Sequence, residues 1–169
     1  RHLMFTAQLP NKGTFVIRYP RGYGFLTDWK CPMEEIKVGT GRKLKEGSAM
    51  AVLSLGPLGN AAKEAIGMVE KEMDITIAHY DMRFLKPLDE NLLSEIGQNF
   101  KKVITVEDGA RNGGFGSAVL EWFSDHNFTP NVVRIGLPDK FIEHGAIKKL
   151  YQEYKLDAEG IADIIKESL

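Results

Sequence analysis

The segment Arg18-Tyr19-Pro20-Arg21-Gly22 carries two arginines at the end of a stretch with strand character. Pro20 fixes its own φ angle and biases the preceding tyrosine towards an extended conformation, so the segment is stiffer than an ordinary loop. An arginine held in this way can present its planar N–H donors to a phosphate or a carboxylate. A solvated arginine, or one at a domain interface, is the commoner role of this residue type.

A second candidate is the glycine-rich run Gly109–Ser117, which follows a predicted strand and opens a predicted helix. Free backbone N–H groups at such a turn can hold an anion. Gly114 and Gly116 resemble the start of a dinucleotide-binding fingerprint, but Val119 stands where its third glycine would be. The run therefore favours a tight turn whose glycines allow close packing over a nucleotide site.

The histidines and serines match no catalytic or metal-binding pattern. The histidines are His2, His79, His126 and His144, and no two of them have the i, i+4 spacing of helical metal ligands. We expect His79 to be a hydrogen-bonded core residue and His144 to lie in a turn. Ser54 and Ser117 lack a nucleophile motif such as Gly-x-Ser-x-Gly.

Three charged residues, Asp81, Arg83 and Asp89, follow a predicted strand. Parallel sheets place their binding loops at this end of a strand, which makes the three residues candidates for ligand contacts. An internal Asp81–Arg83 ion pair or a helix cap explains them as well.

Composition excludes several classes of partner. The 169 residues contain 22 Lys and Arg against 23 Asp and Glu, a net charge of −1, so we expect no nucleic-acid or anionic-membrane partner. The single Cys31 can form neither an internal disulfide nor a cysteine-based metal site, which favours the cytoplasm. No apolar run reaches the roughly 18 residues that a membrane span needs.

Short apolar runs alternate with helical patterns, which predicts strands and helices in turn. This order predicts an α/β fold, a three-layer α/β/α sandwich around a mostly parallel five-stranded sheet with one antiparallel strand. The antiparallel strand is expected at Val38–Leu44, joined by the turn Lys45–Ser48 to a neighbouring strand, since so short a turn links antiparallel neighbours. The expected parallel strands are Ala49–Leu55, Ile75–Tyr80, Lys102–Val106 and Asn131–Ile135. The helical patterns run over Ala62–Met73 after Gly59-Asn60, Leu92–Ile96 after the cap Asp89, Phe115–Phe123, Ile147–Tyr154, and Ile161–Leu169 after the cap Asp157.

The first thirty residues are too few for a core of their own. Thr14–Tyr19 reads as a strand, and a stretch rich in proline and glycine follows it. We therefore expect residues 1–30 to be the tail of a preceding domain with a linker, and residues 35–169 to be a complete domain.

Several motifs, taken in order, resemble one enzyme family. The chain resembles the C-terminal part of the 1-deoxy-D-xylulose-5-phosphate synthases, which are transketolase-like thiamine-diphosphate enzymes. The Asp-Met-Arg-Phe and Gly-Leu-Pro-Asp stretches are specific for that family, whereas the glycine run is shared with transketolases more widely. The motifs are Arg18–Gly22, Asp81–Asp89, Thr105–Asp108, Gly113–Ser117, Ile135–Gly145 and Leu156–Ile161.

The resemblance implies that the full enzyme joins pyruvate to D-glyceraldehyde 3-phosphate with loss of carbon dioxide, using thiamine diphosphate and Mg²⁺. The product would feed isoprenoid, thiamine and pyridoxal phosphate synthesis. The chain would then be a transketolase C-terminal-like domain preceded by the end of the pyrimidine-binding domain. It would pack against the missing N-terminal and pyrimidine-binding domains and across a homodimer, with the glycine run and His144 as candidate contacts.

The same resemblance implies which site residues the chain holds. The second arginine of the Arg-Tyr-Pro-Arg-Gly motif, Arg21, would bind the substrate phosphate. The family's magnesium motif is Gly-Asp-Gly with a later asparagine, whereas this chain has Glu107-Asp108-Gly109 and an asparagine too soon after it. We therefore expect no catalytic residue, no metal site and no cofactor site in this chain, and no activity from it alone.

Two other functions stay open from the residues alone. A free-standing module that binds a nucleotide or effector would need an anion at the Gly113–Gly116 turn. A purely structural dimerisation domain would respond to no ligand, and it overlaps with the first interpretation.

Overall fold

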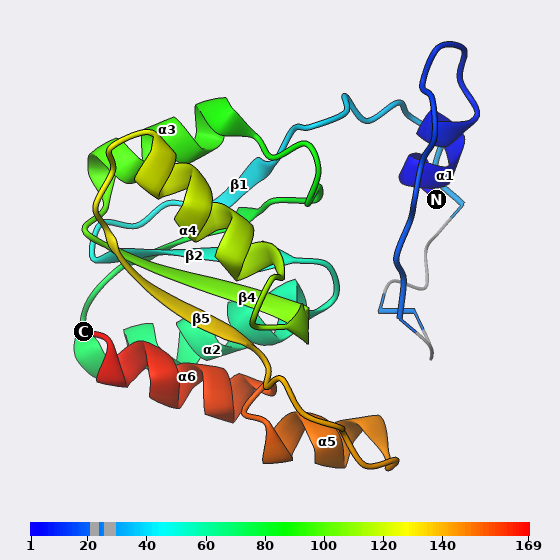
Figure 1. The fold of residues 1–169 in the computed structure, drawn as a ribbon. Coiled ribbons are helices and arrows are strands. Elements are labelled where there is room, and N and C mark those ends of the chain that lie inside the picture. The colour runs from blue at the N-terminus through cyan, green and yellow to red at the C-terminus, as the bar shows by residue number, and fades with distance from the viewer. Residues whose placement is uncertain (21–23, 26–29) are drawn as a thin grey trace.

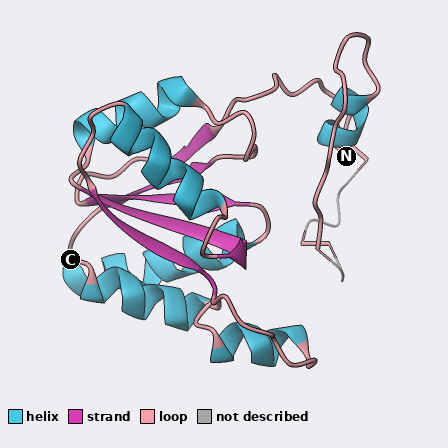
Figure 2. Ribbon diagram, viewed as in Figure 1, coloured by secondary structure: helices cyan, strands magenta, loops and turns pink. Residues whose placement is uncertain are grey.

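A computed structural model describes residues 1–20, 24–25 and 30–169. A five-stranded sheet lies between two layers of helices (Figures 1 and 2). The strands are β1 (Arg42–Lys45), β2 (Met50–Leu55), β3 (Ile77–Asp81), β4 (Lys102–Ala110) and β5 (Asn131–Leu137). The helices are α1 (His2–Ala7), α2 (Leu58–Met73), α3 (Glu90–Asn99), α4 (Phe115–Asp125), α5 (Ile147–Glu153) and α6 (Ala158–Glu167). The predicted three-layer fold is confirmed.

The sheet has the order β1-β3-β2-β4-β5, and β1 is antiparallel to its neighbour while the other pairs are parallel. Alternate residues of each central strand enter opposite cores, as expected of strands covered on both faces. Met50 and Val52 pack under α2 and α6, whereas Ala51 and Leu53 pack under α3 and α4. This alternation decides which face each polar residue at the strand ends will serve.

The position of the antiparallel strand differs from the prediction. The short link joins β1 to β2, but β1 pairs with β3 and not with β2. The two strands that the link joins are therefore not neighbours in the sheet. The link crosses the start of β3, where Ser48 N and Ala49 N both donate to the carbonyl of Thr76. A Cβ atom on Gly47 would lie 2.1 Å from the carbonyl carbon of Ile77, so only glycine lets the link pass this close. Two strand spacings, about 10 Å, are within reach of an extended link of this length.

Two aspartates begin helices as predicted. Asp89 accepts a hydrogen bond from Leu92 N at the start of α3, and Asp157 accepts one from Gly160 N at the start of α6. These bonds satisfy amides that the first turn of a helix leaves without a partner.

The N-terminal residues form a separate small structure that leads into the sheet domain. Thr6 ties α1 to the segment after it, because its hydroxyl accepts from Ile36 N and donates to the carbonyl of His2. The predicted strand Thr14–Tyr19 is wrong: within the described residues these positions pair with no strand, and a strand needs a ladder partner. None of the described helices is both long enough and apolar enough to span a membrane.

Candidate functional site

The strands β2, β3, β4 and β5 all end at one edge of the sheet, which we call the carboxyl edge (Figure 1). Open α/β sheets bind ligands in the loops at this edge. The glycine run, the charged residues after β3 and the two residues Ser54 and His79 all lie at or near this edge, so the carboxyl edge is the candidate site.

The carboxylate of Glu107 lies against the N-terminus of α4. Its two oxygens accept hydrogen bonds from Phe115 N and Gly116 N, each at 2.8 Å, and the residue is 5% exposed. A helix N-terminus favours a negative charge because its free amides and its dipole both point at it. The anion that this turn can hold is therefore already part of the chain, which removes the basis for a nucleotide site.

Two glycines of the run are required by the close packing around this turn. A Cβ atom on Gly114 would lie 2.4 Å from Glu107 Oε2 and 2.2 Å from the carbonyl oxygen of Ala110. A Cβ atom on Gly116 would lie 2.4 Å from the hydroxyl of Thr105. The prediction of a tight, closely packed turn is confirmed. This role of Glu107 was not predicted, although an acid before a glycine-rich helix start is a signal for an internal anion.

The strand β4 is irregular where it carries these residues. Its register against β5 shifts between Val106 and Ala110, which marks a bulge. Within this bulge Asp108 points to the other face and accepts a hydrogen bond of 2.9 Å from the hydroxyl of Tyr151 in α5. Burial first, and the neighbouring carboxylate second, raise the pKa of Tyr151 to about 12, so the phenol stays protonated at neutral pH.

A buried serine–histidine pair lies at the ends of β2 and β3, on the face covered by α2. Ser54 Oγ and His79 Nε2 are 2.9 Å apart, and the hydroxyl is also 3.2 Å from the carbonyl of Tyr80. Burial lowers the pKa of His79 to about 4, against an opposing contribution from Asp81. The two side chains are each 1% exposed, so they match the predicted core histidine and offer no accessible nucleophile.

The charged residues after β3 all contact other residues of the same domain. Asp81 pairs with Arg42 of β1 at 3.0 Å, and not with the side chain of Arg83. Arg83 has a left-handed backbone with φ of 54°, and its guanidinium donates to the carbonyls of Thr40 and Gly41. The helix cap predicted for Asp89 is correct, whereas the Asp81–Arg83 pair is replaced by a pair across the sheet.

The N-terminal segment runs past the carboxyl edge (Figure 1). The ring of Phe15 meets the ring of Phe84 edge-on, with centroids 6.3 Å apart. The guanidinium of Arg18 lies over Gly109, and a Cβ atom there would be 3.2 Å from its Nη1. Arg21, the predicted phosphate-binding residue, lies outside the described residues.

The remaining predicted histidines and Ser117 do not gather into one site. His126 stacks on Trp122, with ring centroids 4.0 Å apart, and His144 is exposed in the irregular segment before α5. His2 lies beside Cys31 in the N-terminal structure. Ser117 accepts from Gly113 N and from Arg134, which makes it part of the glycine turn. Among the described residues no three His, Cys, Asp or Glu side chains gather in a way that could hold a metal ion.

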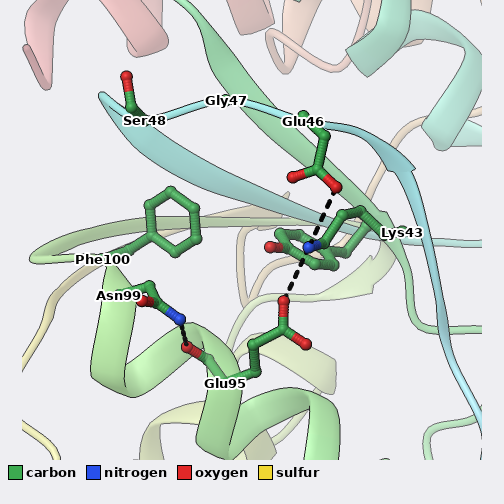
Figure 3. A pocket seen from close by; sticks show the side chains of 8 residues that line it. Lys43, Glu46, Gly47, Ser48, Glu95, Asn99 and Phe100 are labelled. Carbon is green, nitrogen blue, oxygen red and sulfur yellow. Dashed lines mark hydrogen bonds and ion pairs between the residues drawn. The ribbon is translucent and has the colours of Figure 1, made fainter.

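A small cavity of about 270 Å³ lies at the opposite, amino edge of the sheet (Figure 3). Lys43 lies over the ring of Tyr80 there and pairs with Glu95 at 2.8 Å and with Glu46 at 3.3 Å. The bond to Glu95 is the main reason why the pKa of Lys43 is raised. This cluster could not be predicted from the sequence, because its members come from β1, the link after it, β3 and α3.

The comparisons with known proteins agree with this arrangement. Residues 39–161 match the family described as "Transketolase, C-terminal domain". Proteins named 1-deoxy-D-xylulose-5-phosphate synthase are 57% identical over 168 residues in Bacteroides thetaiotaomicron and 59% identical over 165 residues in Phocaeicola vulgatus. These matches cover 99% and 98% of the chain, which spans only 26% of the length of either relative.

Solved structures show the same fold. A structure described as "Split gene transketolase, inactive beta4 tetramer" is 34% identical, with a TM-score of 0.74 over 80% of this chain and 44% of its own. A Pichia stipitis transketolase, with 16% identity and a TM-score of 0.58 over 77% of this chain and 18% of its own, supports the fold alone. The resemblance to the 1-deoxy-D-xylulose-5-phosphate synthases is thus confirmed, and the chain belongs to the family of transketolase C-terminal domains.

Proposed function

We propose that this chain is the C-terminal part of a 1-deoxy-D-xylulose-5-phosphate synthase and contributes packing and assembly to it, not chemistry. The whole enzyme would condense pyruvate with D-glyceraldehyde 3-phosphate with loss of carbon dioxide. The observation that carries this proposal is the match to a relative named 1-deoxy-D-xylulose-5-phosphate synthase. The two sequences are 57% identical over 99% of this chain, and the chain spans only 26% of that relative's length. The internal engagement of Ser54, His79, Glu107 and Asp108 supports it, because these groups serve the domain itself.

The described residues do not fit the cofactor that the family implies. Thiamine diphosphate needs hydrogen-bond donors for its diphosphate, and it needs a magnesium ion. The amides Phe115 N and Gly116 N at the start of α4 already donate to Glu107. The described part of the chain also brings no metal-binding cluster together. We propose that thiamine diphosphate and Mg²⁺ are held by the upstream domains of the full-length enzyme.

The proposed partners are the domains that precede this one and a second copy of the enzyme. Residues 1–30 would end the pyrimidine-binding domain, and residues 35–169 would form the transketolase C-terminal-like domain. The structure described as an inactive tetramer of a split-gene transketolase supports the view that this fold assembles without being active alone. We also propose a cytoplasmic location, because the single cysteine in the sequence can form no disulfide within the chain.

We further propose that Arg21 binds the phosphate of the aldehyde substrate. Its place in the Arg-Tyr-Pro-Arg-Gly motif supports this role, as does the course of the preceding residues past the carboxyl edge. A planar guanidinium can donate two parallel hydrogen bonds to a phosphate.

Turnover by the chain alone is the first test. Purified chain, shown to be folded by circular dichroism, is given both substrates, thiamine diphosphate and Mg²⁺. No product is expected, while the full-length enzyme assayed beside it is active. Product formed by the chain alone would mean that a complete active site lies within these 169 residues and would overturn the proposal.

Substitution of Arg21 in the full-length enzyme tests the phosphate role. Arg21→Ala should raise KM for D-glyceraldehyde 3-phosphate by about a hundredfold while KM for pyruvate changes little, since charge-assisted bidentate bonds are among the strongest in proteins. Arg42→Ala, which removes an arginine paired with Asp81, is the control. Equal effects of Arg21→Ala on both substrates would contradict the assignment.

A further inference from the structure

The segment between β5 and α5, residues 139–147, projects from the sheet domain, and we call it the arm. Its residues 141–146 belong to no helix or strand, and all of them lie outside the core. The helix α5, which follows, has no buried residue. Figure 1 shows the arm and α5 standing away from the two helix layers. The arm therefore adds little to the core of this domain.

Contacts at both ends of the arm nevertheless fix its position. At its start, Lys140 N donates to the carbonyl oxygen of Pro138 at 2.9 Å, and Lys140 Nζ lies 5.1 Å from the centre of the Tyr154 ring. After its end, Tyr151 and Tyr154 pack against the core under α2 and α6. The hydroxyl of Tyr151 also donates to Asp108 in β4. The arm is thus attached to the sheet at both ends.

Two large apolar side chains of the arm are exposed. Phe141 is fully exposed, and Ile147 is 49% exposed. Ile147 has the i, i+4, i+7 spacing with Tyr151 and Tyr154, so it continues the face with which α5 packs on the domain. A single exposed apolar residue is common, but here an apolar helix face extends beyond the domain that it packs on. Such a surface is typical of one that another domain covers.

The place of the arm indicates which domain covers it. The chain spans 26% of its 1-deoxy-D-xylulose-5-phosphate synthase relatives and matches a C-terminal domain, so the rest of the enzyme would precede it. Residues 1–20, which would lead from the preceding domain, pass the carboxyl edge, where the rings of Phe15 and Phe84 meet (Figure 1). The arm starts at the same edge, because it follows the end of β5. The preceding domain is therefore tethered close to the arm, at a high effective concentration.

We propose that the arm docks this domain on the domain that precedes it in the same polypeptide, with Phe141 as the anchor in an apolar pocket of that domain. This inference rests on the function proposed above, and it names the surface and the partner of the packing role. Aromatic side chains are common anchors of interfaces, because they bury a large area with few rotatable bonds.

Photo-crosslinking in the full-length enzyme identifies what covers Phe141. Benzoylphenylalanine replaces Phe141, or, as the control, the exposed Met73 at the end of α2 near the opposite edge of the sheet. Position 141 should form a cross-link within one polypeptide, so that the mass stays that of a single chain and the linked peptide maps to the preceding domain. Position 73 should form no such link.

Three results of this experiment would overturn the proposal. A cross-linked product with the mass of two chains would assign the surface to a second copy of the enzyme. A link from position 141 to a peptide of its own domain would show that the arm folds back. No link from position 141 to the preceding domain would show that this domain does not cover Phe141.

Hydrogen exchange tests whether Phe141 is the anchor. The amides of residues 141–146 should exchange about tenfold more slowly in the full-length enzyme than in the 169-residue chain, because only the longer protein contains the partner domain. Phe141→Ser should remove most of this protection, whereas Met73→Ser should keep it. Equal exchange in the two proteins would overturn the docking, and unchanged protection in Phe141→Ser would overturn the anchor.

Neither measurement depends on turnover, so this inference and the proposed function can fail separately. An active full-length enzyme whose position 141 gives no link to the preceding domain would refute the docking alone. A link to the preceding domain in a full-length protein that does not convert pyruvate and D-glyceraldehyde 3-phosphate would refute the proposed reaction and leave the docking in place.

Discussion

Two polar centres lie at the same edge of the sheet, on opposite faces, and their buried polar groups are stabilised in different ways. On the α2 face, Ser54 and His79 form a neutral pair, kept neutral because burial lowers the pKa of the imidazole. On the α4 face, Glu107 has its carboxylate against two amides of a helix start. A buried charge needs strong partners, whereas a buried neutral group needs only one hydrogen bond. We therefore expect the stability of the α4 centre to depend on its hydrogen-bond partners and on the space left by its glycines. We expect the stability of the α2 centre to depend on pH.

The largest effect should come from removing the carboxylate. Glu107→Ala leaves Phe115 N and Gly116 N without an acceptor in a buried place, at a cost of about 4 kcal/mol of unfolding free energy. Denaturation by urea at pH 7 measures the loss. Glu107→Gln keeps the shape and one acceptor oxygen, so it should cost about half as much. If both variants were as stable as the wild type, the α4 centre would not depend on its anion.

The next effect should be the pH dependence of the α2 centre. The pKa of His79 is about 4 in the folded chain and 6.5 ordinarily, so protons bind to the unfolded state first. Stability from this group is complete above pH 6.5 and is lost as the pH falls towards 4, by about 3 kcal/mol in all. Between pH 7 and pH 4 the unfolding free energy should therefore fall by about 3 kcal/mol more in the wild type than in His79→Gln.

His144→Gln serves as the control for this measurement, because it removes a histidine from an exposed position outside the α2 centre. An unchanged slope in His79→Gln would show that the imidazole is not held neutral and would remove the contrast between the two centres. Asp81 and Lys63 are the charged groups that act on His79, and both stay in place in these variants.

The smallest effect should be a difference in stability between substitutions of Gly114, at the α4 centre, and Gly59, at the α2 centre. Gly114→Ala brings a Cβ atom to 2.2 Å from the carbonyl oxygen of Ala110, which is backbone, and should cost about 2 kcal/mol. Gly59→Ala meets the hydroxyl of Ser54 at 2.8 Å, a side chain that can rotate, and gains the helix propensity of alanine. The melting temperature of Gly59→Ala should therefore stay near that of the wild type. A larger loss in Gly59→Ala than in Gly114→Ala would reverse the comparison.

Much of this architecture could be predicted from periodicity and helix starts. Apolar runs gave the parallel strands, and Asp89 and Asp157 marked two helices, because these signals are local in the sequence. The pairing of β1 with β3 could not be predicted, since it depends on how closely the backbone at Gly47 can cross another strand. The role of Lys43 was missed for the same reason, because its partners lie on elements that only the fold brings together. The role of Glu107 was missed although its partners are close in the sequence, because the acid before the glycine run was not interpreted as an internal anion.

The crossing at Gly47 also has a consequence for local unfolding. The chain passes from the edge strand β1 directly to β2, yet β3, which comes later in the chain, lies between these two strands in the sheet. The pair β2–β3 and its helix α2 need no such order, because α2 connects two strands that are parallel neighbours. Exchange of the β1 amides with solvent deuterium should therefore report partial openings that the central strands do not share. In such openings the link at Gly47 would act as a hinge, releasing β1 while leaving the parallel strands intact.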